Sequence, residues 1–352
     1  MLKRFWESAW LRLLLKPLGW GYGSAMALRR RLYDQGYLDS HRFSQPVISV
    51  GNLTVGGTGK TPVVSAILDL LPPEFRPALV LARGYGASFV HERVELNDEG
   101  HLLRSRHPNH LHVQGADRVA AALRVVGDPP PAVIVLDDGA QHLQIQRDVE
   151  ILLFDARSLL KPRGILPAGP WRESLAAARG ADALVLTRTD RVDASALSKI
   201  EAELSELAPE VPVFRCRHVA RDLVPLALGP KDRPRHLSEL AKRRVGLVSG
   251  IADPNSFADL VQQLGASVSW HESFPDHYLY HRDDLDRILA HAEVDPVDEI
   301  LVTEKDRAKL AALGGAATGF SVLRIDIDFG DDGARFASLL EQSLKEAKRE
   351  RT

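Results

Sequence analysis

A glycine-rich segment that ends in Lys60 and Thr61 carries the strongest chemical signal in the sequence. It reads Val-Gly-Gly-Thr-Gly-Lys-Thr over residues 55–61 and follows an apolar run, which is the strand, loop and helix context of a phosphate-binding loop. Glycines let backbone N–H groups turn toward phosphate oxygens, and the N-terminus of the following helix adds positive potential. The Lys60 ammonium can reach the β- and γ-phosphates of a nucleotide, and the Thr61 hydroxyl can ligate Mg²⁺. The predicted nucleotide-binding residues are Thr54, Val55, Gly56, Gly57, Thr58, Gly59, Lys60 and Thr61.

Two carboxylates end another apolar run further along the chain. Asp137 and Asp138 follow the sequence Val-Ile-Val-Leu, and Gln141 and His142 make the next turn polar. Carboxylates at a strand end can hold Mg²⁺ directly or through water, although solvated carboxylates at such positions are also common. Beside a phosphate-binding loop, the two aspartates predict a metal site that they share with the Thr61 hydroxyl.

The composition restricts the class of protein. The 352 residues, 45% hydrophobic and 26% charged, indicate a globular chain of about two domains and exclude disordered and fibrous architectures. The 45 Lys and Arg residues balance 47 Asp and Glu residues, which argues against a general nucleic-acid binder. Cys216 is the single cysteine, which excludes an intramolecular disulfide and a cysteine cluster for zinc or iron–sulfur binding. The chain therefore fits a reducing compartment.

The first 42 residues differ from the rest in charge and hydropathy. They carry eight basic and three acidic residues, a charge of +5 in a chain of net charge −2, and they are rich in Leu and Trp. The apolar run Leu13–Leu15 ends at Lys16 and Pro17, far short of the about 20 residues that span a bilayer, and no signal-peptide cleavage site follows. Trp and Leu mixed with Lys and Arg favour a helix lying in the membrane interface. The alternative is a helix packed on the core with its arginines in solvent.

The elements that must position these residues follow from hydrophobic patterning. Beyond residue 45, short β-branched runs alternate with helical stretches, which predicts βαβ units and a largely parallel sheet covered on both faces. The predicted strands are Pro46–Val50, Ala78–Ala82, Ala132–Asp137, Ile151–Asp155, Ala183–Thr187 and Val211–Cys216, then Val245–Ser249, Ser267–Trp270, Ile300–Thr303 and Val322–Ile327. We expect an α/β fold class with two α/β/α sandwich domains, the larger N-terminal one a P-loop NTPase-like parallel sheet.

The proline-rich stretch Leu223–Arg235 is the best domain boundary. We expect a basic, membrane-associating segment at residues 1–42, a P-loop domain at 43–224, a smaller α/β domain at 225–330 and a C-terminal helix at 331–352. The apolar stripe of that last helix can pack on either domain.

Five further motifs accompany the phosphate-binding loop in a fixed order. They are Arg83–Gly86, Asp137–His142, Leu166–Glu173, Phe274–His277 and Thr303–Asp306. Together they resemble the motifs of the tetraacyldisaccharide 4′-kinase family of lipid A biosynthesis, from about residue 46 to 310. The basic, apolar N-terminus also suits the membrane-associated start of that family.

The resemblance implies a lipid kinase that uses ATP and Mg²⁺ to phosphorylate the 4′-hydroxyl of tetraacyldisaccharide 1-phosphate. It implies a peripheral or monotopic protein on the cytoplasmic face of the bacterial inner membrane. The family's catalytic aspartate maps onto Asp98, although Asn97 replaces a glycine of the family motif and a simple turn is the alternative there. The family's catalytic histidine maps onto His277, which would orient Asp98 by a hydrogen bond, while Lys60 neutralises phosphate charge. Where the family often has a second histidine, this chain has Tyr278.

Five more residues are candidates for contacts with phosphates or with the sugar headgroup: Arg83, Gln141, His142, Arg172 and Glu173. Arginine offers a bidentate fork for phosphate, although each of these residues can equally be structural, and Glu173 can pair with Arg172. The expected partners are the lipid A precursor and the inner-membrane surface, with no nucleic acid. The oligomeric state stays open.

Other classes of protein share part of this pattern. The usual phosphate-binding loop has glycine six residues before its lysine, where this chain has Thr54, so a flexible loop with an incidental Lys-Thr pair is one alternative. Another P-loop NTPase, such as an ATP-dependent ligase or a metallochaperone-type GTPase, would share Lys60, Thr61 and the acidic strand end. Thr187–Asp190 is only a loose echo of a guanine-reading motif. A non-catalytic membrane scaffold would bind ATP without lipid-dependent turnover.

Overall fold

The chain folds into two units of α/β structure. The computed structural model describes residue 6 and residues 9–84, 89–90, 93–94, 96–125, 129–227, 233–314 and 319–351. Unit 1 comprises Met1–Glu95, His107–Arg217 and Asp328–Thr352, and unit 2 comprises Leu96–Arg106 and His218–Ile327. The chain therefore passes from one unit to the other four times.

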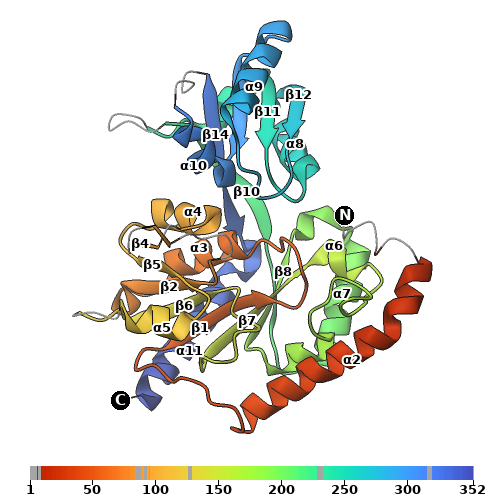
Figure 1. Ribbon diagram of the computed structural model, residues 1–352, viewed down its shortest axis with the longest axis vertical. Helices are drawn as coiled ribbons and strands as arrows, with labels where there is room; N and C mark the ends of the chain where they lie inside the picture. Colours follow the sequence, from red (N-terminus) through yellow and green to blue (C-terminus); the bar gives the residue numbers. More distant parts are fainter. Residues whose placement is uncertain are drawn as a thin grey trace. The chain divides into compact units, whose positions relative to one another are not determined.

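Unit 1 is built on a seven-stranded sheet in the order β5-β2-β6-β1-β7-β8-β9, and every neighbouring pair is parallel (Figure 1). Its strands are β1 (Val47–Asn52), β2 (Ala78–Ala82), β5 (Leu111–Gln114), β6 (Val133–Asp137), β7 (Val149–Asp155), β8 (Ala183–Thr187) and β9 (Val213–Arg215). Its helices are α2 (Ala9–Asp34), α3 (Lys60–Leu70), α5 (Arg118–Leu123), α6 (Ala156–Leu159), α7 (Ala194–Leu207) and α11 (Gly333–Glu350). A short antiparallel pair joins β3 (Phe89–Val90) and β4 (Arg93–Val94).

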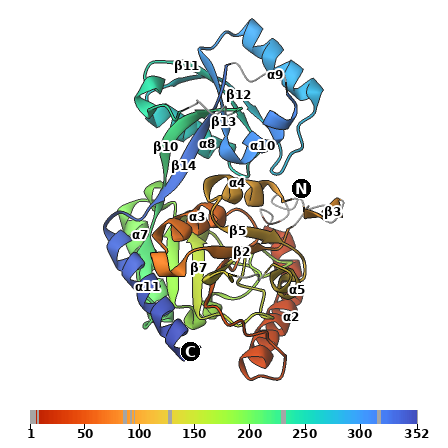
Figure 2. The same ribbon diagram turned by 90° about the vertical axis from the view of Figure 1, so that its left-hand side faces the viewer.

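The central strands β1, β6, β7 and β8 are buried along their whole length. This explains their near-continuous apolar sequences, since a parallel sheet covered on both faces has no solvent-facing side. Helices α2 and α11 lie on opposite sides of the sheet (Figure 2). Because the strands are parallel, their carboxyl ends share one edge, where Val50 is in register with Asp137 and Asp155 with Thr187. The loop that follows β1 starts at this edge.

Helix α11 belongs to unit 1. Its residues Phe336, Leu340 and Leu344 recur every fourth position and are fully buried. The ring of Phe336 stacks on that of Phe329 at 4.4 Å and meets the ring of Phe214 edge-on at 5.2 Å. The sequence left open which unit this helix joins, and its contacts decide for unit 1.

Unit 2 is built on a five-stranded sheet in the order β10-β14-β13-β11-β12. Its strands are β10 (Arg217–Pro225), β11 (Arg244–Ser249), β12 (Ser267–Ser273), β13 (Glu299–Thr303) and β14 (Phe320–Asp328). Its helices are α4 (Asp98–Arg106), α8 (Pro254–Gln263), α9 (Arg282–Val294) and α10 (Glu304–Ala312). Strand β11 pairs in parallel with β12 and β13, and β13 with β14.

The predicted α/β class with a large parallel sheet is confirmed. Two strands of unit 1, β2 and β8, have the predicted bounds, and the other predicted strands are observed with ends shifted by a few residues. The prediction missed β5 and β10 of the two larger sheets, and the two-residue strands β3 and β4. In β10, Arg217, Arg221 and Asp222 interrupt the apolar residues, so no strand pattern is visible.

The division into units differs from the expected one at residues 224 and 225. Strand β10 already belongs to the second sheet, and Leu96–Arg106 is grouped with unit 2 although it lies within the expected P-loop domain. Pro230 of the predicted boundary lies outside the described residues.

Helix α2 is a 26-residue amphipathic helix that contains Pro17. Its exposed large apolar side chains are Trp10, Leu13, Leu14, Leu18, Trp20 and Leu28. Within the described residues, no helix is both long and apolar enough to cross a bilayer. Residues 1–5, 7 and 8 of the expected N-terminal segment lie outside the described residues.

Candidate nucleotide and phosphoryl-transfer site

The loop between β1 and α3 has the backbone of a phosphate-binding loop. Gly56 has φ of 112° and Gly59, the residue before α3, has φ of 84°, a left-handed conformation that glycine adopts without strain. A Cβ atom added at Gly56 would meet open space, so nothing in the described part of the chain fills that side of the loop. Lys60 and Thr61 form the first turn of α3, where the free N–H groups of a helix attract anions.

Side chains from the end of β8 hold the loop in place. The Thr187 hydroxyl donates to the carbonyl of Thr58 at 2.9 Å, and the Arg188 guanidinium donates to the carbonyl of Gly57 at 3.0 Å. Arg188 also pairs with Asp155 at the end of β7, at 2.5 Å. These bonds fix the carbonyls of the loop toward β8, which leaves the opposite side of the loop for a ligand.

Lys60 connects the loop to the acidic end of β6. Its Nζ atom lies 3.2 Å from Asn52 Oδ1 and 3.4 Å from Asp138 Oδ1. Asp138 also pairs with Arg172, at 3.3 Å. Burial opposes ionisation of Asp138, but the charges of Lys60 and Arg172 outweigh it and lower the pKa of this carboxyl. Asp138 is therefore ionised throughout the neutral range.

The donor set fits Mg²⁺ bound together with nucleotide phosphates. Asp137 and Asp138 end β6, and Thr61 begins α3. Among the residues that the structure describes, no group of three or more His, Cys, Asp or Glu side chains is arranged to hold a metal ion. Protein-bound Mg²⁺ usually has only one or two carboxylate ligands, and phosphates and waters supply the others.

A hydrogen-bonded group of polar side chains adjoins Asp138. Gln141 Oε1 accepts from Arg172 at 2.8 Å, and Gln141 Nε2 donates to Glu173 at 3.0 Å. Glu173 also accepts from Arg30 of α2, at 3.0 Å, so it is hydrogen-bonded to Arg30 and Gln141 rather than paired with its neighbour Arg172. The structure thus brings together three of the five residues proposed for phosphate or headgroup contacts.

The other two residues of that set lie differently. His142 lies near these groups, and burial, reinforced by Arg118 and Arg147, lowers its pKa to about 4, so it carries no charge at neutral pH. Arg83 is exposed just after the end of β2. Tyr85 and Gly86 of its motif lie outside the described residues.

Arg118 is a buried residue of this site that the sequence did not single out. It begins α5, is 2% exposed, and donates to the backbone carbonyl of Asp138 at 3.0 Å. Burial lowers its pKa, and Asp138 and Asp137 oppose that shift. Nothing in the sequence indicates that its side chain turns toward β6, because that contact depends on how α5 packs.

Unit 2 contains a separate cluster of charged side chains around Asp98. The carboxylate of Asp98 lies 3.5 Å from His277 Nδ1 and 2.9 Å from Lys309 Nζ. Lys305 donates to Asp276 at 2.8 Å and lies 3.2 Å from His277 Nε2. The structure therefore brings together Asp98 of α4 and His277 of the loop before α9, which lie 179 positions apart in the sequence.

The pKa values of this pair are shifted apart. Burial opposes ionisation of Asp98, but hydrogen bonds from His277 and Lys309 outweigh it and lower its pKa to about 2. The bond to Asp98 raises the pKa of His277 against the effect of burial. Both changes favour an ionised carboxylate beside an imidazolium.

Asn97 starts α4 rather than forming the simple turn that was the alternative. Its Oδ1 atom accepts from the N–H of Gly100 at 3.0 Å, the geometry of an N-cap. The asparagine that departs from the family motif thus caps the helix that presents Asp98. Tyr278 donates to Asp284 and leaves His277 as the imidazole beside Asp98.

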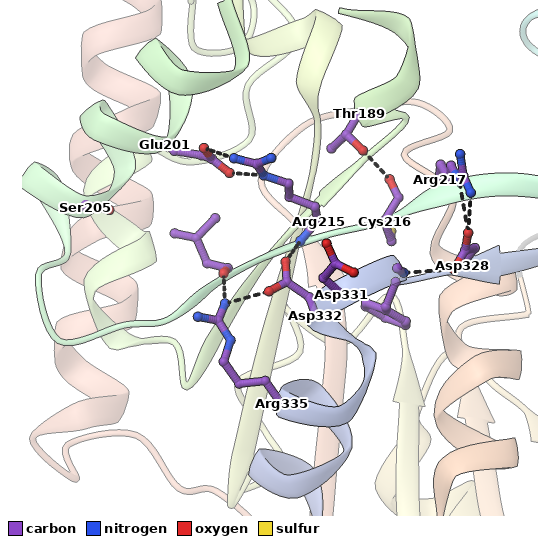
Figure 3. A pocket seen from close by; sticks show the side chains of 13 residues that line it. Thr189, Glu201, Ser205, Arg215, Cys216, Arg217, Asp328, Asp331, Asp332 and Arg335 are labelled. Atoms are coloured by element: carbon purple, nitrogen blue, oxygen red, sulfur yellow. Dashed lines mark hydrogen bonds and ion pairs between the residues drawn. The ribbon is translucent and has the colours of Figure 1, made fainter. Parts of the chain in front are cut away.

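A cavity of about 540 Å³ lies in unit 1 at the carboxyl ends of β8 and β9 (Figure 3). Ion pairs line it, including Arg215 with Glu201 at 2.5 Å and Arg217 with Asp328 at 2.8 Å. The Thr189 hydroxyl points to the carbonyl of Cys216 at 3.2 Å. The cavity therefore begins one residue beyond Arg188, which holds the phosphate-binding loop.

Comparisons with known proteins agree on one family. Residues 11–345 match the model of the family described as tetraacyldisaccharide-1-P 4′-kinase. Relatives named tetraacyldisaccharide 4′-kinase include a protein of Anaeromyxobacter dehalogenans strain 2CP-1, 34% identical over 97% of this chain and 94% of its own length. Another, from Anaeromyxobacter sp. strain Fw109-5, is 35% identical over 94% of this chain and 92% of its own.

A solved structure shows the same fold. It is a crystal structure described as an "apo" form of LpxK from Aquifex aeolicus in complex with ATP, with a TM-score of 0.72 and 29% sequence identity over 95% of this chain and 99% of that chain. The family match extends over nearly the whole chain and includes both the phosphate-binding loop and the Asp98 cluster. This chain belongs to the tetraacyldisaccharide 4′-kinase family.

Proposed function

We propose that this chain transfers the γ-phosphoryl group of ATP to the 4′-hydroxyl of a tetraacyldisaccharide 1-phosphate. The observation that carries the proposal is the place of Lys60, at the head of α3 and 3.4 Å from Asp138, in a chain of this family. Phosphoryl transfer depends mainly on positioning and on neutralising charge, and these residues supply both.

The phosphate-binding loop and Lys60 would hold the β- and γ-phosphates. The carbonyls of Gly57 and Thr58 are occupied by β8, which supports a role for the opposite side of the loop in phosphate binding. Thr61, Asp137 and Asp138 are the residues that would hold Mg²⁺. When bound, Mg²⁺ would neutralise charge on the transferred group. Arg172 and Gln141 lie beside Asp138, and we expect them to contact the phosphates or the sugar headgroup.

Asp98 would accept the proton of the sugar hydroxyl. A sugar hydroxyl loses its proton late in phosphoryl transfer, so its acceptor has to be ionised and well placed more than strongly basic. Lys309 and His277 keep Asp98 in this state. We assign His277 to orienting the carboxylate and stabilising its charge.

We further infer that the nucleoside of ATP extends over β8 and β9. Lys60 and Asp138 mark the γ-phosphate end on the β6 side of the loop, and Arg188 and Thr187 contact the loop from the β8 side. The cavity beside Thr189 and Cys216 offers space there. Filling it by Ser205→Trp would weaken binding of MgATP and leave binding of Mg-tripolyphosphate unchanged, and equal losses for both ligands would contradict this inference.

We infer that α2 brings the enzyme to the cytoplasmic face of the inner membrane. Its exposed Trp and Leu side chains, mixed with Lys and Arg, are typical of a helix in the membrane interface. The acyl chains of the substrate lie in the bilayer, so a helix at that surface would keep the site close to the sugar headgroup.

The test is transfer of ³²P from γ-labelled ATP to purified tetraacyldisaccharide 1-phosphate in detergent with Mg²⁺. We expect wild type to label the lipid and Lys60→Ala and Asp98→Ala to lose most activity, while Lys199→Ala, on the exposed side of α7, keeps it. If Asp98→Ala is as active as wild type, Asp98 is not the acceptor. If folded, ATP-binding wild type labels no lipid, another P-loop enzyme or a scaffold is the better explanation, and a guanine-nucleotide preference would favour a GTPase.

A further inference from the structure

Helix α2 reaches the phosphate site through a half-buried arginine. Arg30 Nε donates to Glu173 Oε2 at 3.0 Å, and Arg30 Nη2 donates to the carbonyl of Ala140 at 3.2 Å. The preceding Arg29 donates to the carbonyl of Gln141 at 3.2 Å. Two consecutive arginines of α2 thus bind the loop that follows β6.

From Glu173, an unbroken series of polar contacts leads to the phosphate-binding lysine. Glu173 accepts from Gln141 at 3.0 Å, and Gln141 accepts from Arg172 at 2.8 Å. Arg172 pairs with Asp138 at 3.3 Å, and Asp138 pairs with Lys60 at 3.4 Å. All these residues belong to unit 1.

Arg30 is the cation that binds the buried carboxylate at the start of this series. The side chain of Glu173 is only 8% exposed, and it is hydrogen-bonded to Arg30, which is 16% exposed, and to the neutral amide of Gln141. Arg30 also lies 3.6 Å from the buried Glu150. A buried carboxylate deprived of its hydrogen-bonded cation is costly, so without Arg30 we expect Glu173 to turn toward Arg172.

That turn would disturb the phosphate site. Glu173 holds the amide of Gln141, and that amide presents its oxygen to Arg172. Asp138 pairs with two cations, Lys60 and Arg172. If Arg172 turned to Glu173, Asp138 would keep only Lys60. A shift of about 1 Å at such groups can cost about 100-fold in rate.

Helix α2 also carries exposed apolar side chains. Trp10 and Trp20 are 73% and 70% exposed, and Leu13, Leu14 and Leu18 accompany them. Arg31, next to Arg30, is exposed as well. One helix therefore combines a face suited to a lipid surface with a residue built into the phosphate site.

We propose that Arg30 is a positioning residue for phosphoryl transfer, which sets Gln141 and Arg172 through Glu173 and makes α2 a structural part of the phosphate site. The proposal rests on the proposed kinase function for its rate measurements. It implies that α2 is needed for catalysis even when the lipid is presented in detergent micelles without a bilayer.

The test compares Arg30→Met with Arg31→Met. Both remove one charge from the same helix, so their effects on attraction to an anionic membrane are matched. In detergent, we expect Arg30→Met to lower kcat by about 10-fold to 100-fold with little change in the KM for lipid. Arg31→Met should stay within about twofold of wild type, as most exposed substitutions do. Both variants should bind anionic vesicles equally well.

Two further variants separate positioning from folding. Arg30→Lys keeps the charge and should recover part of kcat. Glu173→Gln should lower kcat, and the double variant with Arg30→Met should be no worse than the poorer single variant, because both act through one contact. Thermal unfolding of each variant identifies any loss that is due to misfolding.

Three outcomes would overturn the proposal: equal losses in Arg30→Met and Arg31→Met, an unchanged kcat in Arg30→Met, or additive losses in the double variant. If wild type phosphorylates no lipid, the proposed function fails, and the inference is then decided by the affinity for MgATP. In that case weaker MgATP binding by Arg30→Met than by Arg31→Met supports it, and equal binding overturns it.

Discussion

Lys309 Nζ lies 2.9 Å from Asp98 Oδ2 and 3.3 Å from Asp306 Oδ1. Asp306 is fully buried, and it also accepts from the N–H of Gly250 and from the Thr303 hydroxyl. Because its second carboxylate partner is fixed in this manner, the ammonium of Lys309 is held against Asp98. The ionised state of Asp98 is thus built into the packing of α10 on α4.

Replacing Lys309 by Met should raise the pKa of Asp98 from about 2, because burial then acts against fewer partners. A depressed carboxyl pKa stabilises the ionised form above the unfolded value of 3.8, and this contribution is lost as the pH falls toward 2. In the variant, we expect the acid limb of kcat/KM to move upward by about one pH unit or more. Lys309→Arg keeps the charge and should restore the wild-type limb. An unmoved acid limb in Lys309→Met would show that Lys309 does not control Asp98.

The ion pair of Asp98 with His277 should weaken at alkaline pH. The pKa of His277 is raised above 6.5, so its contribution to stability is complete below 6.5 and disappears as the pH rises through the higher folded-state value. Since the side chain is 53% exposed, solvent screening limits this contribution to less than about 1 kcal/mol. Urea unfolding of wild type and His277→Asn should differ most near pH 6 and converge at alkaline pH. His236→Asn, at an exposed histidine of unit 2, is the control, and a constant difference between His277→Asn and wild type would contradict the assignment.

Removing the cap of α4 should destabilise the helix that carries Asp98. Asn97→Ala leaves the N–H of Gly100 without its side-chain acceptor, and we expect a loss of about 1 kcal/mol in the free energy of unfolding. Asn97→Asp keeps the acceptor and should be close to wild type. Denaturant unfolding measures both values. If Asn97→Ala is as stable as Asn97→Asp, the cap contributes nothing.

Removing leucines from the exposed face of α2 should weaken membrane binding without slowing chemistry. Leu13 and Leu14 are 65% and 64% exposed, and burying a leucine in an apolar phase is worth about 2 kcal/mol. The double change to Ser should lower affinity for anionic vesicles by more than about tenfold. It should raise the KM for lipid in vesicles and leave kcat in detergent near wild type. Leu160→Ser, at a similarly exposed leucine outside α2, should change neither quantity, and an equal effect of both changes would argue against α2 as the docking face.

The sequence alone predicted the α/β class, the phosphate-binding loop and the acidic end of β6. These features are local: a buried strand, glycines and a Lys-Thr pair lie within 15 residues of one another, and their spacing carries the information. Asp98 and His277 could be named only from the resemblance to a family, because a carboxylate and an imidazole this far apart in sequence carry no spacing signal.

Arg30, Arg118 and Lys309 were not predicted as parts of the site. Each lies on a helix and reaches its partner only through tertiary packing, which the sequence does not indicate. Arg30 binds Glu173, Arg118 binds the carbonyl of Asp138, and Lys309 binds Asp98. Strand β10 was missed for a similar reason. Its charged residues interrupt the apolar pattern, and Asp222 finds its partner, Arg324 of β14, only in the folded sheet.

The four passages of the chain between the units limit how this protein can be taken apart. A fragment of residues 218–327 contains the second sheet and helices α8, α9 and α10, but it lacks α4. It therefore also lacks Arg106 of α4, which pairs with Glu304 and Asp326. Glu304, which is buried in the whole protein, would lose this ion pair. A gene-level exchange of unit 2 between relatives therefore has to carry two separate segments together. The two units fold as distinct bodies, but neither is encoded by one continuous stretch of the gene, so recombination at a single site cannot exchange one of them intact.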